Sequence, residues 1–456
     1  MIAREELPRK LSLLDATLIV IGVVIGSGIF LLPNLVARNL PSASAMIAVW
    51  VAAGVLSFFG ALAYAELGAL MPATGGQYVY LREAYGSWCA FLSGWVFVLA
   101  ALPGGIAFLA VGFSMYLDRF IPLTPGMRTL VSLGLLAILS AVNYVGVRES
   151  VWIQRIFTTL KIAGLLVIIG AALFAAPVAV TAGSVAPHIS YQGAGIAMAA
   201  CLMAYNGWSY VSFVAGEVRN PERNLPKALA LGMTAVMILY VSANLAYLRV
   251  LTLAQIAASE RVGADVAARV LGSAGATAMS VIVLLSIVGA INGCILTAAR
   301  VPFAQARDGL FFSRFGHIHP RFKTPAFAIA VQAVWAGVLI VSGSYEMLSS
   351  YTIISAWLFY TFCAAAVWVL RRKMPHAPRP YKMWGYPLTM YLFLIVSIWF
   401  IVDAMVNQPV PSLMAFFIAA AGTPFYFFWR RSSRLNPVLI EPSTVKDPSP
   451  NTWPAP

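Results

Sequence analysis

Twelve long stretches of apolar residues, separated by short polar segments, divide most of the chain. The apolar runs are continuous rather than alternating, and each is close to the about 20 residues that a helix needs to cross a bilayer. Because the membrane interior accepts only helices and closed barrels, this pattern predicts an all-α polytopic membrane protein. The predicted spans are residues 13–36, 43–70, 88–117, 127–146, 151–174, 193–216, 227–248, 274–300, 325–342, 347–370, 385–406 and 412–429.

The composition also indicates that a bilayer covers the protein. Of the 456 residues, 61% are hydrophobic and 10% are charged, and the mean hydropathy is +0.84. An ordinary soluble domain is about 45–50% apolar and about 25% charged. These values exclude a soluble enzyme, a nucleic-acid-binding protein and a disordered scaffold.

The net charge of +14 is explained by membrane topology. With a cytoplasmic N-terminus, the inner loops and tails hold 23 of the 30 Lys and Arg residues, as the positive-inside rule requires. We therefore expect a multi-pass protein of the plasma (cell inner) membrane with both termini in the cytoplasm. Residues 1–12 form the N-terminal segment, and the Pro-rich residues 430–456 are expected to be a disordered tail.

Two spans carry helix-breaking motifs near mid-depth. Three glycines and a serine lie within residues 22–28 of the first span, and Asn-Gly lies within residues 205–209 of the sixth. Close packing through Gly22 and Gly26, and a simple kink in the sixth span, are the alternatives without function. Paired breaks in two halves instead indicate a transporter site. Freed N–H and carbonyl groups suit the carboxylate and ammonium of an α-amino acid.

The positions of the two breaks also predict the domain organisation. The broken spans are five apart, which divides the chain into inverted five-helix repeats at residues 13–174 and 193–370. Two further helices follow in residues 385–429.

Lys161 lies near the middle of the fifth span, where a charge is costly and usually functional. Its ammonium either occupies the position of a coupling Na⁺, donating to carbonyls of the broken first span, or carries a proton. The sequence leaves both roles open. The acidic residues Asp15, Glu66 and Glu217 lie near membrane faces, as inner ion pairs or solvated ends. With no carboxylate or arginine at mid-depth, the substrate side chain is expected to be neutral.

The sequence contains no signature of catalysis. It has no GxSxG, HExxH or GxxxxGK[ST] motif, and its four cysteines show no CxxC spacing. We therefore expect no enzyme activity, no cofactor and no metal site.

Several motifs, in order, resemble those of the amino acid–polyamine–organocation (APC) superfamily and, within it, the L-type amino acid transporter subgroup. The resemblance covers about residues 10 to 430. The motifs lie at residues 25–30, 65–68, 75–78, 204–208, 217–226, 291–293, 299–300 and 306–309.

This resemblance implies a LeuT-like 5+5 inverted repeat with helices 1 and 6 broken, and a role for each matching residue. Ser27 and Gly28 would bind the substrate carboxylate through backbone N–H groups, and Ser27 also through its hydroxyl. Carbonyl groups of Val24, Met203 and Asn206 would bind the α-amino group. The other positions that it implies are Gly26, Tyr205 and Gly207 at the breaks, Ala100 and Ala101 in the side-chain pocket, Lys161 at the vacated sodium position, and Asn292 in the supporting eighth span.

The chain departs from the subgroup in three places. Met203 stands where an aromatic residue usually closes over the substrate, and Ala290 stands where relatives often have a serine near the lysine. The loop at residues 118–126 has no cysteine, so we expect no disulfide-linked heavy subunit, as in prokaryotic members.

The sequence therefore predicts a secondary active transporter of neutral L-amino acids, working as a sodium-independent exchanger by alternating access. A proton-coupled symporter is the nearest alternative, and a membrane sensor that binds amino acids without transporting them is an alternative of another class. A polyamine carrier is disfavoured by the missing carboxylates. The expected partners are small neutral amino acids and the lipid bilayer, with no nucleic acid, and a homodimer stays open.

Overall fold

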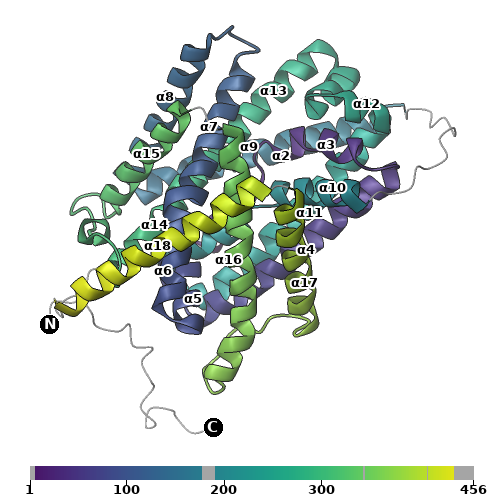
Figure 1. Cartoon of the computed structure of the whole chain (residues 1–456). Coiled ribbons are helices and arrows are strands. Elements are labelled where there is room, and N and C mark those ends of the chain that lie inside the picture. The colour runs from purple at the N-terminus through teal and green to yellow at the C-terminus, as the bar shows by residue number, and fades with distance from the viewer. Residues whose placement is uncertain (1–5, 177–190, 343–344, 408, 436–456) are drawn as a thin grey trace.

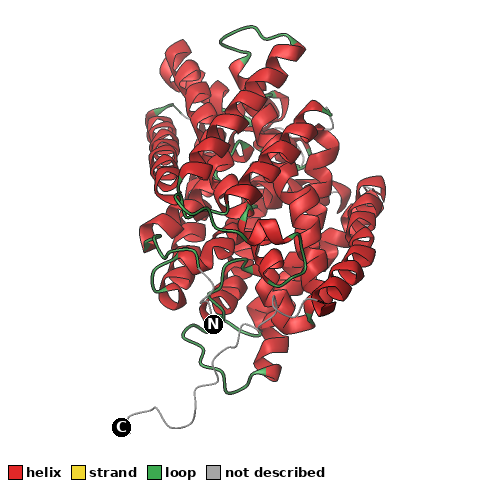
Figure 2. Cartoon of the chain, turned by 90° about the vertical axis from the view of Figure 1, so that its left-hand side faces the viewer, coloured by secondary structure: helices red, strands yellow, loops and turns green. Residues whose placement is uncertain are grey.

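The computed structural model describes residues 6–176, 191–342, 345–407 and 409–435. In these ranges the chain is helical apart from its loops (Figure 2). The elements up to residue 174 are α1 (Leu13–Val24), α2 (Gly28–Leu31), α3 (Pro33–Arg38), α4 (Ala43–Leu70), α5 (Gln77–Tyr85), α6 (Ser87–Val96), η1 (Phe97–Ala101), α7 (Leu102–Leu117), α8 (Pro125–Val145) and α9 (Val147–Phe174).

The second part of the chain is built in the same way. Its elements are α10 (Tyr191–Ala204), η2 (Trp208–Glu217), α11 (Pro221–Val250), α12 (Leu253–Ala258), α13 (Val262–Ala298), α14 (Arg300–Arg307), η3 (Ser313–Gly316), α15 (Ala326–Val341), α16 (Tyr345–Lys373), α17 (Leu388–Asn407) and α18 (Pro409–Leu435).

The predicted spans correspond to these helices. Ten helical runs in the described ranges are long and apolar enough to cross a membrane, and α15 is a shorter apolar helix. The sixth predicted span is the pair α10 and η2, separated by a break. The fold class, an all-α polytopic membrane protein with helices 1 and 6 broken, is therefore confirmed. The domain boundaries stay predictions, and most of the predicted tail at 430–456 lies outside the described residues.

Helix α1 lies in the centre of the bundle, in contact with α9, α11, α13 and η2. Gly22 is needed there, because an added Cβ would lie 1.9 Å from Gln154 Nε2 and 2.3 Å from Thr158 Oγ1 on α9. The packing interpretation of Gly22 is thus correct. Gly26 differs, since the nearest atom to its Cβ would be in Leu109, at 3.6 Å. At the periphery, α18 lies across α6 (Figure 1).

The third span changes its helix type near its middle. The N–H of Leu102 bonds to the carbonyl of Phe97, five residues earlier, which defines the π-helical turn η1. The regular helix α7 begins at Leu102, and Pro103, which has no N–H to donate, lies in its first turn. This turn decides which residues of the third span face the centre of the bundle.

Candidate binding site between two broken helices

The first break leaves donors of the main chain free. Helix α1 ends at Val24, and Ser27 is the N-cap of α2 without using its hydroxyl as a cap. Within the described chain, the backbone N–H groups of Ser27 and Gly28 donate to no other residue. These groups stand at the N-terminal end of a helix and are therefore suited to a carboxylate.

The sixth span breaks at its Asn-Gly motif. Tyr205 still bonds to Cys201 as in a helix, whereas the Asn206 N–H turns back to the Met203 carbonyl at 3.2 Å. Gly207 has a φ of 110°, a conformation that favours glycine, and its Cβ would lie 2.7 Å from Val23 Cγ1. The glycine therefore allows both the turn and the close approach of the two breaks.

Tyr240 of α11 joins the two breaks. Its hydroxyl lies 3.0 Å from the carbonyl oxygen of Val24 and 3.2 Å from that of Ala204. The side chain is fully buried, and its ring packs against Trp50 and Tyr205 at centroid distances of 5.7 and 4.9 Å. A single side chain thus fixes the spacing between the ends of α1 and α10.

These contacts change which carbonyl of α1 is available. The Val24 carbonyl accepts hydrogen bonds from the Gly26 N–H at 2.9 Å and from the Tyr240 hydroxyl, which uses both of its lone pairs. The Val23 carbonyl accepts no hydrogen bond from the described residues. The geometry therefore favours Val23, rather than the predicted Val24, as an acceptor for a bound ammonium.

Lys161 lies on α9 with its side chain fully buried. Its Nζ donates to the carbonyl groups of Gly22 (2.9 Å), Ile25 (2.6 Å) and Ser286 (2.9 Å). The Ser286 hydroxyl donates to Ile25 and Gly26, at 2.9 and 3.0 Å. The ammonium therefore stabilises the broken end of α1 from outside the helix and connects it to α13.

A serine does lie beside Lys161, one helical turn before Ala290. Ala290 occupies the position at which a serine was expected from the family resemblance. Its methyl group would lie 3.9 Å from a Cβ added at Gly26. Ser286, one turn earlier on the same helix, supplies the hydroxyl. Lys161 thus donates to carbonyl groups of the broken first span, and the two acceptors there are Gly22 and Ile25.

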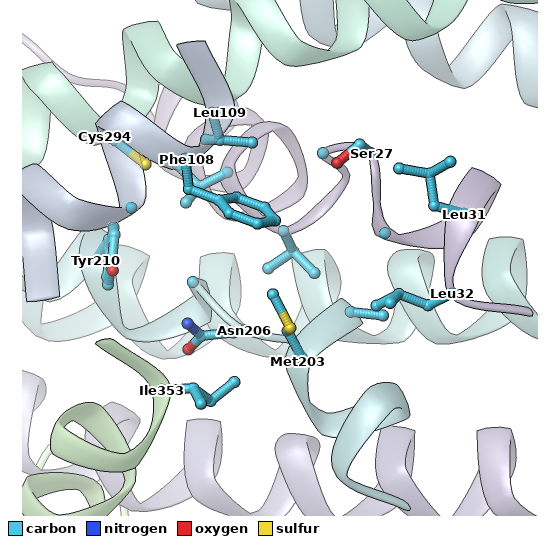
Figure 3. Close-up of a pocket in the computed structure, with 17 residues that line it drawn as sticks. Ser27, Leu31, Leu32, Phe108, Leu109, Met203, Asn206, Tyr210, Cys294 and Ile353 are labelled. Atoms are coloured by element: carbon cyan, nitrogen blue, oxygen red, sulfur yellow. The ribbon is translucent and has the colours of Figure 1, made fainter. Parts of the chain in front are cut away.

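A cavity of about 140 Å³ lies between the two breaks (Figure 3). In the part of the chain that the structure describes, none of its lining side chains is charged. Phe108 lies on one side of the cavity, and Met203 and the Asn206 amide lie on the opposite side (Figure 3). The predicted site residues that line the cavity are Val24, Gly26, Ser27, Gly28, Met203, Asn206 and Gly207.

Three predicted pocket residues lie outside the cavity lining. Ala100 and Ala101 are buried in the π-helical turn, and Tyr205 is buried against Trp50 and Tyr240. Because of that turn, the third span instead presents residues further along the chain. The residues from α7 that line the cavity are Gly105, Phe108 and Leu109.

Asn292 supports the site without touching the cavity. Its Oδ1 accepts from Asn143 (3.0 Å), and its Nδ2 donates to the Ser150 carbonyl and to Gln154 Oε1, both at 3.0 Å. Gln154 in turn lies 3.5 Å from the Leu18 carbonyl of α1. The eighth span thereby reaches the first through a buried polar network.

The side of the bundle that carries the start of the chain is closed beneath the cavity. Leu11 pairs with the end of η2, through its N–H to the Glu217 carbonyl (2.9 Å) and its carbonyl to the Arg219 N–H (2.8 Å). The Glu217 carboxylate binds Arg300 at 2.7 and 2.9 Å, with both side chains fully buried. The ion-pair interpretation of Glu217 is therefore correct.

The two other acidic residues near membrane faces are also paired. Asp15 binds Arg155 at 2.6 Å, and Glu66 binds Arg371 at 2.9 and 2.7 Å. Both carboxylates are buried, so neither is a solvated helix end.

Four residues that shape the site are not among those predicted from the sequence. Tyr240, Phe108 and Leu109 belong to apolar spans whose pattern gives no sign of a special role. Ser286 was within reach of sequence reasoning, because a serine one turn from Ala290 lies on the same helix face.

Comparisons with known proteins agree with this geometry. A family model described as amino acid permease matches residues 11–428. The serine/threonine exchanger SteT of Bacillus subtilis is 30% identical over 424 residues, which cover 92% of this chain and 97% of that protein.

Human relatives are similarly close. The b(0,+)-type amino acid transporter 1 is 31% identical over 93% of this chain and 88% of its own length. The large neutral amino acids transporter small subunit 2 is 32% identical over 96% and 84%, respectively. With one family model spanning nearly all of the helices and the relatives aligned almost end to end, the chain belongs to the amino acid permease family of the APC superfamily and is an amino acid transporter, not an enzyme.

Proposed function

We propose that this protein is a secondary active transporter of small neutral L-amino acids that exchanges them across the plasma membrane without sodium. The observation that carries the proposal is the position of Lys161. Its ammonium satisfies the carbonyl groups of Gly22 and Ile25 at the break, where a coupling cation would otherwise be required. A cation fixed to the chain removes the need for one from solution.

The cavity supports a zwitterionic substrate. The N–H groups of Ser27 and Gly28 would bind the carboxylate, and the Val23 carbonyl would accept from the α-amino group. These three backbone groups have no hydrogen-bond partner among the described residues, so a bound ligand would supply it. A neutral side chain fits because the lining of the cavity carries no charge.

The size of the cavity favours small side chains. About 140 Å³ is little beside the about 300–1,000 Å³ of pockets for drug-sized ligands. Phe108 and Met203 occupy the space into which a longer side chain would extend. Serine, threonine and alanine are therefore the preferred candidates, which agrees with the printed name of the bacterial relative, a serine/threonine exchanger.

Exchange is tested with the purified chain in proteoliposomes. Uptake of labelled L-serine should be several-fold faster when the vesicles contain unlabelled L-serine than when they are empty, and equal in sodium and in choline buffer. L-arginine and L-glutamate should compete poorly. Uptake that does not respond to internal serine at any pH would remove the exchange proposal.

The same vesicles distinguish the alternatives. Accumulation driven by an imposed pH gradient would indicate proton coupling, and serine binding without flux would indicate a sensor. Activity of the chain alone also tests the proposal that no heavy subunit is required. Its four cysteines, Cys89, Cys201, Cys294 and Cys363, are free in the structure.

Orientation is tested separately. We propose that both termini are cytoplasmic. A protease-cleavable tag at the N-terminus should therefore be protected in intact cells and cleaved after permeabilisation.

A further inference from the structure

A second cavity, of about 550 Å³, lies between the start of α1, the start of α9 and the segment that follows η2. It is separate from the binding cavity, with which it shares no lining residue. Basic and apolar side chains line it, with a single acid. Its lining consists of Lys10, Leu11, Asp15, Val147, Arg148, Val151, Trp152, Arg155 and Arg219.

The charges of this cavity are not balanced within the described chain. Asp15 is neutralised by Arg155 at 2.6 Å and also accepts hydrogen bonds from Ser12. The side chains of Lys10, Arg148 and Arg219 form no hydrogen bond or ion pair with any described residue, and all three residues are exposed. Three unpaired cations that line one cavity, whose single acid is already paired with Arg155, attract an anion.

The surroundings of the cavity are those of a membrane interface. Trp152 is 54% exposed on its rim, and tryptophan is enriched where the acyl region meets the head groups. Leu14 on α1 and Ile156 on α9, next to the cavity, are 57% and 50% exposed. Both helices are long and apolar enough to cross a membrane, so these exposed apolar side chains are suited to contact acyl chains. An anion held here would therefore lie at the level of the lipid phosphates.

We propose that this cavity binds the phosphate group of an anionic phospholipid, held by Lys10, Arg148 and Arg219, with an acyl chain lying over Trp152 and Ile156. A free phosphate ester offers the same charge without the chain. The apolar rim favours the lipid.

Such a lipid would act on the closed end of the transporter. Its ligands come from the segment before α1, the start of α9 and the segment that follows η2, and the pairing of Leu11 with Val218 joins the first and the last of these. A single phosphate contacting all three would stabilise their closed arrangement. We therefore expect anionic lipid to slow the opening of this side of the bundle, in addition to any effect on folding.

The test measures lipid binding to the full chain in neutral detergent by native mass spectrometry, with phosphatidylglycerol and phosphatidylcholine as probes. Arg148→Gln with Arg219→Gln should weaken phosphatidylglycerol binding by about fivefold for each charge removed. The matched control is Arg430→Gln with Arg431→Gln, which removes two exposed charges from the end of α18 and should leave binding unchanged. Lys10→Gln, before α1, is the second variant if the double variant does not fold.

Each outcome decides the proposal. Preference for phosphatidylglycerol that is lost in the cavity variants and kept in the control supports it, and slower serine exchange in vesicles rich in phosphatidylglycerol supports the proposed effect on opening. Equal loss in cavity and control variants would show a general surface-charge effect and overturn it. Glycerol 3-phosphate or inorganic phosphate could also raise the unfolding temperature as much as phosphatidylglycerol does. That result would overturn the proposal of a lipid ligand and indicate a free phosphate instead.

Discussion

Lys161 is a buried charge with no carboxylate beside it among the described residues. Three carbonyl dipoles replace the counter-ion, and two of them, those of Gly22 and Ile25, are available because α1 ends at Val24 and its last carbonyl groups lack helical N–H partners. The cost of burying the ammonium and the cost of breaking the helix therefore offset each other. Neither feature is stable alone, which explains why they occur together.

Replacing Lys161 with Met keeps the bulk of the side chain and removes the donor. The Gly22 and Ser286 carbonyl groups then lose its hydrogen bonds, while Ile25 keeps the hydroxyl of Ser286. An unsatisfied buried polar group costs about 1–3 kcal/mol, so we expect a lower midpoint of thermal unfolding and loss of serine uptake. Lys382→Met, at an exposed loop position, is the control. Normal serine affinity in Lys161→Met would contradict the role assigned to the ammonium.

Phe108 is expected to set the upper limit of substrate size. Phe108→Ala removes the ring that faces Met203 across the cavity, so leucine should gain several-fold over serine in competition for uptake (Figure 3). Phe174→Ala, at a position 93% exposed at the end of α9, controls for the loss of a phenyl ring. An unchanged order of substrates would show that another side chain limits their size.

At the scale of elements, the two breaks act as one structure. Gly207 approaches Val23, and the Tyr240 hydroxyl lies between the carbonyl groups that end α1 and α10. The half-helices are therefore held at a fixed separation, which a ligand with two charged groups requires.

Tyr240→Phe tests this connection, and the same helix offers a matched control. Tyr240→Phe should lower serine affinity and cost about 1–3 kcal/mol of stability, because the buried Ala204 carbonyl loses its hydroxyl donor and the Val24 carbonyl keeps only the Gly26 N–H. Tyr247→Phe, about two turns later on α11, removes a buried hydroxyl that has no hydrogen-bond partner among the described residues and should be neutral or stabilising. Binding isotherms and thermal unfolding of both variants give the comparison, and equal effects would contradict the proposed link.

The breaks could be predicted from sequence because their causes are local. Glycine and Asn-Gly disfavour a helix wherever they occur, and a lysine in an apolar span is conspicuous. Tyr240 could not be predicted, since a tyrosine in an apolar span is ordinary until its partners are known. The cavity lining does not include Ala100 and Ala101 for a related reason. The π-helical turn before Pro103 shifts the face of the third span, and a regular helical period does not include that shift.

At the scale of the whole molecule, the closed side depends on contacts between distant segments. Glu217 ends η2, Arg300 begins α14, and Leu11 precedes α1, yet all three meet beneath the cavity. Sequence placed Glu217 near a membrane face, but it could not identify Arg300 as its partner. That choice depends on how the spans pack, and no local pattern encodes it.

A double-mutant cycle measures the contribution of the buried pair. Glu217→Gln or Arg300→Met alone should destabilise the protein by about 3–5 kcal/mol, because each leaves an unpaired buried charge. The double variant should recover part of that loss and favour opening of this side of the bundle. Thermal unfolding and serine exchange rates provide the values, and strictly additive effects would show that the pair is not coupled.

The covalent attachment of the Lys161 ammonium has an energetic consequence. If the proposed function is correct, the cation at the break belongs to the protein and stays with it through every cycle, and the cargo is a zwitterion. No net charge then moves, so the membrane voltage performs no work on transport. The protein can convert one amino acid gradient into another, but it cannot concentrate its whole set of substrates against their combined gradient.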